Sequence, residues 1–201
     1  MRALIILIAL TRLASADPSN ERLFYTGLAL APPDYLLGVA LHEGSHALMA
    51  EIIGADVEEV HLFPPGRDPH VHKFRFGWTY VRGLHTRNQR VAFYLAPKIT
   101  DALLFTAAVI PSPDNRYGQL ALTVFATGLW IDFSKDLFIF NSTNDVPRAF
   151  HTWCMYGWKQ IAPRVLYGAL VGVSGYFLYR TYQKTFTDES TVMMPLGTMR
   201  F

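Results

Sequence analysis

Residues 42–46 read His-Glu-Gly-Ser-His, and the types and spacing of these residues are suited to hydrolytic metal chemistry. Side chains four residues apart lie on one face of a helix, so His42 and His46 are expected to direct ring nitrogens toward one Zn²⁺ ion. The carboxylate of Glu43 would lie beside that ion, where it can take a proton from a zinc-bound water. The motif therefore predicts His42 and His46 as metal ligands and Glu43 as the catalytic base.

The segments on both sides of this motif are apolar. Residues 35–41 precede it, and residues 47–53 follow it as far as Gly54, which is a typical helix end. A surface helix with two histidines needs no metal, but burying two histidines and a glutamate in an apolar helix is costly unless they find partners. A divalent cation satisfies all three side chains, so the context favours a metal site over a chance match.

The composition indicates a membrane protein without a nucleic-acid partner. Of the 201 residues, 51% are hydrophobic and only 17% are charged, which is apolar for a soluble domain. The net charge is only +2, and no basic stripe with interleaved aromatic residues is present. The single Cys154 excludes an internal disulfide.

Four apolar stretches approach the length of a membrane helix: residues 35–54, 91–110, 117–133 and 163–179. Buried helices of a soluble protein are the alternative, because charged residues lie within these stretches. Among them, Lys98 and Asp101 can neutralise each other as an intrahelical pair. The loop after the first stretch is rich in arginine and lysine, which places it in the cytoplasm. We expect a mainly α-helical, multi-pass membrane protein with about four transmembrane helices, in contact with lipid in a bacterial inner membrane.

The two ends of the chain differ from its middle. Residues 1–16 have the positive start, the short apolar core and the small-residue site of a cleaved signal peptide, with an uncleaved anchor as the alternative. Residues 17–182 would form the membrane-embedded domain. Residues 183–201 are polar and would form a flexible tail.

A β-hairpin is predicted directly after the helix that carries the histidines. Residues 57–63 and 70–81 alternate between apolar and polar side chains, and a Pro-rich turn cluster separates them. His61, His70 and His72 lie in this region and are candidate extra metal ligands. Ordinary strand positions are the alternative, because histidines two residues apart share a strand face without a metal.

A catalytic zinc ion usually takes three protein ligands and keeps one position open, so a third ligand is needed. A metzincin would have a histidine at position 52, where this chain has Ile52. A thermolysin-like site would take a glutamate from a second helix shortly downstream, where this chain has the predicted hairpin. Neither common arrangement fits.

Residues 42–54, the following segments 57–60 and 62–64, and residues 95–104 resemble the site-two protease family of intramembrane zinc metalloproteases. In that family a core helix carries His-Glu-x-x-His and ends at a glycine, and a hairpin follows. The resemblance implies that Asp145 is the third zinc ligand and that Asn141 holds the substrate backbone. Asp132 and Asp136 are rival ligands, and a helix N-cap is the alternative role for Asp145.

The expected function is that of a zinc-dependent intramembrane endopeptidase. It would hydrolyse peptide bonds in or near the transmembrane segments of a membrane-protein substrate, with the zinc-bound water activated by Glu43. Two alternatives remain open at this point. One is a non-proteolytic membrane protein with a structural or vestigial metal site, and the other is a secreted soluble metallopeptidase.

Overall fold

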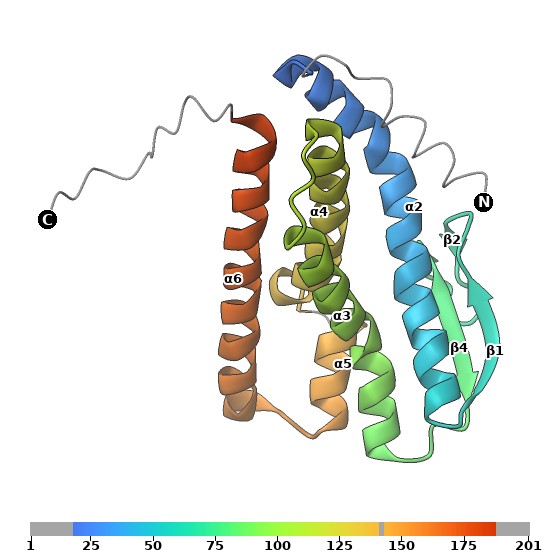
Figure 1. The fold of residues 1–201 in the computed structure, drawn as a ribbon. Coiled ribbons are helices and arrows are strands. Elements are labelled where there is room, and N and C mark those ends of the chain that lie inside the picture. Colours follow the sequence, from blue (N-terminus) through green and yellow to red (C-terminus); the bar gives the residue numbers. More distant parts are fainter. Residues whose placement is uncertain (1–17, 141–142, 188–201) are drawn as a thin grey trace, which may run out of the picture.

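The computed structural model describes residues 18–140 and 143–187 of the chain. This part is mainly helical, as predicted, and its successive long helices run in opposite directions (Figure 1). The predicted signal peptide lies outside the described residues. The last helix includes residues 183–186, which the sequence analysis assigned to the polar tail, and residues 188–201 of that tail lie outside the described residues. The helices are α2 (Asn20–Ile52), α3 (Arg87–Val109), α4 (Arg116–Phe138), α5 (Asp145–Thr152) and α6 (Ile161–Phe186), with a 3-10 turn η1 (Gly157–Gln160) before α6.

The hairpin follows α2, as the alternating pattern predicted. Strand β1 (Asp56–His61) pairs in antiparallel fashion with β4 (Trp78–Arg82), and the strands lie along the end of α2 (Figure 1). The connection contains a second, smaller antiparallel pair, β2 (Gly66–Arg67) and β3 (Phe74–Arg75). The predicted second strand, residues 70–81, is therefore shorter and divided: residues 69–71 form a turn, and residues 76–77 separate β3 from β4.

Asp68 explains this turn. Its side chain is fully buried and accepts hydrogen bonds from the backbone N–H groups of His70, at 2.9 Å, and Val71, at 3.2 Å. The hydroxyl of Tyr80 donates to the same carboxylate at 2.6 Å, and Arg75 lies 3.2 Å from it. Burial raises the pKa of Asp68, but these hydrogen bonds and the Arg75 charge outweigh burial and hold the pKa below its usual value. The hairpin connection is thus organised around one ionised carboxylate.

Two apolar clusters hold the helices together. The larger one joins α3, α4 and α6 through small and large side chains that alternate across the contact. The smaller one joins the end of α2 to the start of α3, directly beside the hairpin. The buried members are Phe105, Ala108, Ala126, Leu129 and Leu178 in the first cluster, and Ala50, Ala55 and Phe93 in the second.

Polar contacts tie three helix ends together on the side opposite the hairpin. Asn20, at the start of α2, donates from Nδ2 to the carbonyl oxygen of Phe186 at 3.0 Å. Arg116, at the start of α4, donates to the carbonyl oxygens of Thr185 and Pro18. The start of α2 is thereby held beside the end of α6, so the first and last helices of the described part of the chain contact each other.

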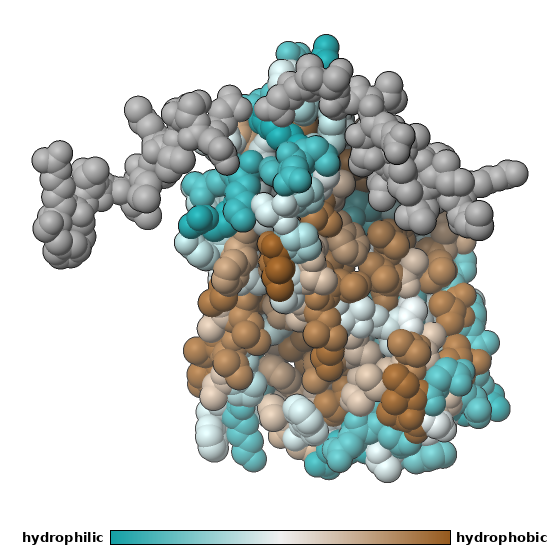
Figure 2. Space-filling view, viewed as in Figure 1, coloured by the Kyte–Doolittle hydropathy of each residue, from teal (hydrophilic) through white to brown (hydrophobic). Residues whose placement is uncertain are grey.

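Two helical segments are long and apolar enough to cross a membrane: α3 and the segment Gly157–Phe186. Within the described residues, α2 and α4 do not pass the same test, so two of the four predicted stretches qualify. Only 11% of the apolar window of the α6 segment is buried, against 44% of that of α3. Apolar residues form a broad belt across the visible face, and hydrophilic residues lie at both ends (Figure 2). This surface is consistent with a membrane protein.

Gly77 allows the hairpin to approach α2 closely, because it has no side chain. A Cβ atom at this position would lie 2.8 Å from Cγ of Glu43 and 2.9 Å from Cγ1 of Val39. We expect Gly77→Ala to push the hairpin away from α2 and to destabilise the protein by about 1–3 kcal/mol. Thermal unfolding in detergent, followed by circular dichroism, measures this effect.

Gly38→Ala is the matched control, because an added Cβ atom there meets nothing within 4 Å. It removes a glycine from a helix interior and should stabilise by up to about 1 kcal/mol. Equal melting temperatures for both variants would show that the contact between Gly77 and α2 does not limit the packing of the hairpin.

Candidate metal centre

The structure brings His42, His46 and Asp145 together, although about a hundred residues separate the histidines from the aspartate in the sequence. The two histidines lie one turn apart on α2, and Asp145 is the first residue of α5. Nε2 of His42 is 3.1 Å from Oδ2 of Asp145, and Nε2 of His46 is 3.6 Å from Oδ1. One ligand atom from each residue lies within 4.8 Å of the other two.

The Nδ1 atom of each histidine contacts an oxygen atom on the side of the ring away from Asp145. Nδ1 of His42 is 2.9 Å from Oδ2 of Asp132, and Nδ1 of His46 is 2.8 Å from the carbonyl oxygen of Phe93. A carbonyl oxygen cannot donate, so the proton of His46 must be on Nδ1, and the carboxylate of Asp132 favours the same tautomer for His42. Both Nε2 atoms face Asp145, and in the Nδ1–H tautomer each can offer its lone pair to a cation, as metal-binding histidines do.

Asp132 is held in place by two lysines. Nζ of Lys98 is 2.8 Å from Oδ2 of Asp132 and 2.5 Å from its carbonyl oxygen, and Lys135 contacts Oδ1. Their positive charges compensate the carboxylate in this poorly solvated place. Lys98 was expected to pair with Asp101 on its own helix, and the structure instead directs its ammonium group across to α4.

Asp136 anchors the helix that carries Asp145. Its side chain is fully buried, and Oδ2 accepts the backbone N–H of Val146 at 2.9 Å. A carboxylate at the first turn of a helix satisfies an otherwise unpaired N–H and interacts favourably with the helix dipole. The three candidate aspartates thus occupy different places: Asp145 faces both histidines, Asp132 supports His42, and Asp136 holds the start of α5. Asn144 is the residue before this helix, so Asp145 is not its N-cap.

Glu43 is buried, and its carboxylate is oriented by the hairpin. The hydroxyl of Thr79, on β4, lies 2.8 Å from Oε2 of Glu43 and 3.1 Å from its carbonyl oxygen. The sequence analysis did not single out Thr79. The alternating pattern placed it on a strand, but no local signal linked that strand to Glu43.

The remaining predicted residues are not part of this cluster. The ring of His61 stacks on Trp78 with centroids 3.8 Å apart, and Nε2 of His70 is 3.5 Å from Glu59. Within the described residues, His61, His70 and His72 belong to no group of three close ligand atoms, which favours their interpretation as ordinary hairpin positions. Asn141, the predicted substrate-binding residue, lies outside the described residues.

The donor set fits a zinc ion. Two imidazole nitrogens and one carboxylate oxygen are a common ligand set of catalytic zinc, and they leave a fourth position open. The contact between His42 and Asp132 is of the carboxylate–histidine type that orients such ligands. Without a cation, the two Nε2 atoms and the carboxylate of Asp145 would have only one another as partners in this buried site.

Comparisons of this chain with protein-family models, with curated proteins and with solved structures find no match. The chemistry of the site and the sequence resemblance are therefore what supports a function.

We expect measurements of zinc binding by variants to distinguish the roles of the candidate aspartates. Asp145→Ala removes a ligand and should abolish stoichiometric zinc binding. Asp132→Asn keeps all three ligands but loses the charged support of His42, and it should weaken zinc affinity by about 10–100-fold. Metal analysis of purified protein and competition with a chelator of known affinity measure both effects.

Asp114→Asn provides the control, because Asp114 is exposed in the connection between α3 and α4. Its zinc content should equal that of the unaltered protein. Full zinc occupancy in Asp145→Ala would exclude Asp145 as a ligand and return Asp132 and Asp136 as candidates.

Proposed function

We propose that this chain is a zinc-dependent intramembrane endopeptidase that hydrolyses peptide bonds in or near the transmembrane segments of another membrane protein. The observation that carries the proposal is the convergence of the Nε2 atoms of His42 and His46 on the carboxylate of Asp145. The sequence resemblance to site-two proteases supports the same reaction. The apolar belt supports a location in the membrane (Figure 2).

His42, His46 and Asp145 would hold the zinc ion. When bound, zinc lowers the pKa of a water molecule and polarises the carbonyl group of the scissile peptide bond. The remaining chemistry belongs to the protein's own side chains. Asp132 and the carbonyl oxygen of Phe93 keep the two imidazoles in the ligand tautomer.

Glu43 is the general base of the proposal. Its carboxylate accepts the proton of the attacking water and then delivers it to the nitrogen of the leaving amine. Thr79 engages Oε2, which leaves Oε1 as the oxygen that exchanges the proton. Because Thr79 belongs to β4, the hairpin fixes the orientation of the base.

In this proposal α2 and α4 also cross the membrane, which gives four spans together with α3 and α6. Their polar side chains have partners inside the bundle: His42 of α2 contacts Asp132 of α4, and Asp132 contacts Lys98 of α3 and Lys135 of α4. Charged residues in a membrane are tolerated when they pair inside the bundle, so these contacts account for the lower hydropathy of α2 and α4. The arginine-rich hairpin loop would face the cytoplasm of a bacterial cell.

Replacing the base tests the reaction. Glu43→Gln keeps the shape of the side chain but cannot accept the proton, so we expect cleavage of a transmembrane substrate to fall by at least about 100-fold. Zinc content should stay at the level of the unaltered protein. The assay uses protein purified in detergent, with a library of fluorescently labelled transmembrane peptides and mass spectrometry of the products.

Glu51→Gln is the matched control, since Glu51 lies on the same helix at an exposed position. It should cleave as fast as the unaltered protein. Undiminished cleavage by a clean preparation of Glu43→Gln would contradict the role of Glu43. Bound zinc without cleavage in the unaltered protein would favour a non-proteolytic membrane protein with a structural metal site.

Extraction at alkaline pH tests the location separately from the reaction. A protein with membrane-spanning helices should remain in the membrane pellet after sodium carbonate treatment, because the apolar belt stays in lipid. Release into the supernatant would contradict the membrane location and favour a soluble metallopeptidase. Fractionation followed by immunoblotting reads out either result.

A further inference from the structure

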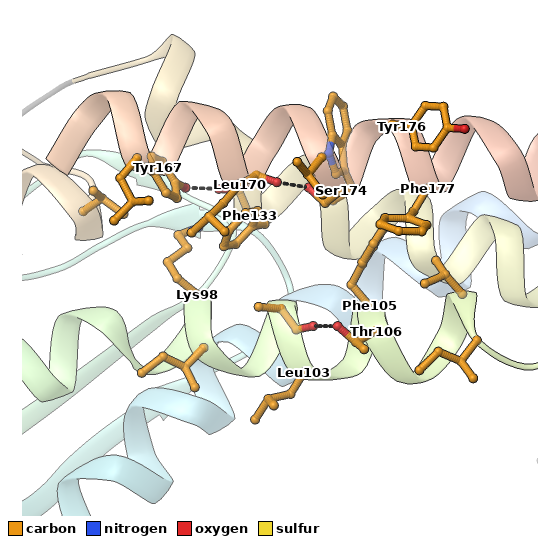
Figure 3. Close-up of a pocket in the computed structure, with 18 of the residues that line it drawn as sticks. Lys98, Leu103, Phe105, Thr106, Phe133, Tyr167, Leu170, Ser174, Tyr176 and Phe177 are labelled. Atoms are coloured by element: carbon orange, nitrogen blue, oxygen red, sulfur yellow. Dashed lines mark hydrogen bonds between the residues drawn. The ribbon is translucent and has the colours of Figure 1, made fainter. Parts of the chain in front are cut away.

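A large apolar groove lies between α3 and α6, on the side of α3 away from the hairpin. Its volume is about 1160 Å³, and α4 forms its floor with Trp130 and Phe133. Figure 3 shows Leu103 and Phe105 of α3 on one wall, with α6 on the other. The two walls touch each other little, so the groove opens between the two helices that qualify as membrane spans.

The lining of the groove is at least as long as one leaflet of a bilayer is thick. Its lining extends from Leu95 to Ile110 on α3 and from Pro163 to Lys184 on α6. At the rise of an α-helix these segments measure about 20 Å and about 30 Å. The hydrocarbon core of a bilayer is about 30 Å thick, so the groove offers the apolar depth that acyl chains require.

Two cations at one end of the groove have no carboxylate partner among residues 18–140 and 143–187. Arg180 and Lys184 lie one turn apart on α6, and both line the groove. Within the described residues neither side chain contacts a carboxylate, and the guanidinium of Arg180 donates only to the hydroxyl of Tyr176, at 3.3 Å. Lys98 lines the groove farther along, but its charge is taken up by Asp132. In the described part of the chain, the uncompensated positive charge of the groove therefore lies at the end near the C-terminus of α6.

We propose that this groove is a binding site for an anionic glycerophospholipid, with its acyl chains along α3 and α6 and its phosphate at Arg180 and Lys184. Arginine and lysine bind phosphate by charge-assisted hydrogen bonds, and each such residue near a membrane surface contributes about 1 kcal/mol toward anionic lipid. The inference rests on the membrane location but not on hydrolytic activity. An apolar membrane-spanning helix would fill the groove but would leave both cations without partners.

Trp130 reports on occupancy, because its indole lies in the floor of the groove (Figure 3 shows this pocket). The purified full chain is reconstituted into phosphatidylcholine vesicles with increasing fractions of phosphatidylglycerol brominated on its acyl chains. Bromine quenches tryptophan fluorescence at short range. Quenching should saturate at a low fraction of brominated phosphatidylglycerol, and brominated phosphatidylcholine should need a much higher fraction. Trp130→Phe identifies the part of the signal that belongs to the groove.

The charge variants decide between a specific site and surrounding lipid. The double variant Arg180→Gln/Lys184→Gln should lose about 25-fold in its preference for phosphatidylglycerol, about five-fold for each cation. The double variant Arg22→Gln/Lys159→Gln removes the same charge from exposed positions outside the groove and should keep the preference. Circular dichroism and size-exclusion chromatography verify that both variants fold.

Three results would overturn the proposal. Equal quenching by the two brominated lipids would show surrounding lipid without headgroup selection. An unchanged preference in the Arg180/Lys184 variant would place the anionic headgroup elsewhere. Absence of Trp130 quenching by either lipid, in folded protein, would indicate that a protein helix fills the groove. None of these results depends on zinc or on peptide cleavage, so the proposed reaction stands or falls separately.

Discussion

The imidazole of His42 lies between two aspartates, and the arrangement of the site depends on this contact. Nε2 faces Asp145 on α5 and Nδ1 faces Asp132 on α4, while the ring itself belongs to α2. One side chain thus connects α2 to two helices, α4 and α5, that come much later in the sequence. Because a histidine presents two nitrogens at a fixed angle, the positions of α4 and α5 relative to α2 are coupled to the geometry of the candidate metal centre.

The buried charges around His42 explain why the helices differ in hydropathy. Lys98 and Lys135 compensate Asp132, and Asp136 satisfies the backbone at the start of α5. His42 and Lys98 reach Asp132 from neighbouring helices, and Lys135 reaches it from within α4, which lets α2 and α4 carry charges inside an apolar molecule. Helix α6 contributes no charged side chain to the contacts around His42, and this helix is apolar and mostly exposed. Polar chemistry is concentrated in the helices at the centre, and the outer helix faces its surroundings.

The hairpin and the groove lie on opposite sides of this polar centre. The hairpin contacts α2 through Thr79, which holds the carboxylate of Glu43, and through the close approach of Gly77. The groove borders the centre through Lys98 and through Val146, the neighbour of Asp145. The hairpin, which orients the carboxylate of Glu43, and the apolar groove, which is suited to lipid, therefore lie on different sides of the molecule. Helices α3 and α4 lie between them.

The sequence by itself determined the features that depend on local spacing. The histidine spacing, the apolar stretches and the alternating segments predicted the helix that carries the motif, the mainly helical class and the hairpin, because helix and strand periods are local properties. Tertiary structure decided which aspartate faces the histidines, which residue Lys98 pairs with, and how Thr79 meets Glu43. These contacts join residues that lie from 34 positions apart, for Lys98 and Asp132, to 103 positions apart, for His42 and Asp145. No local period encodes such contacts, since they arise only when helices pack and every buried polar group must find a partner.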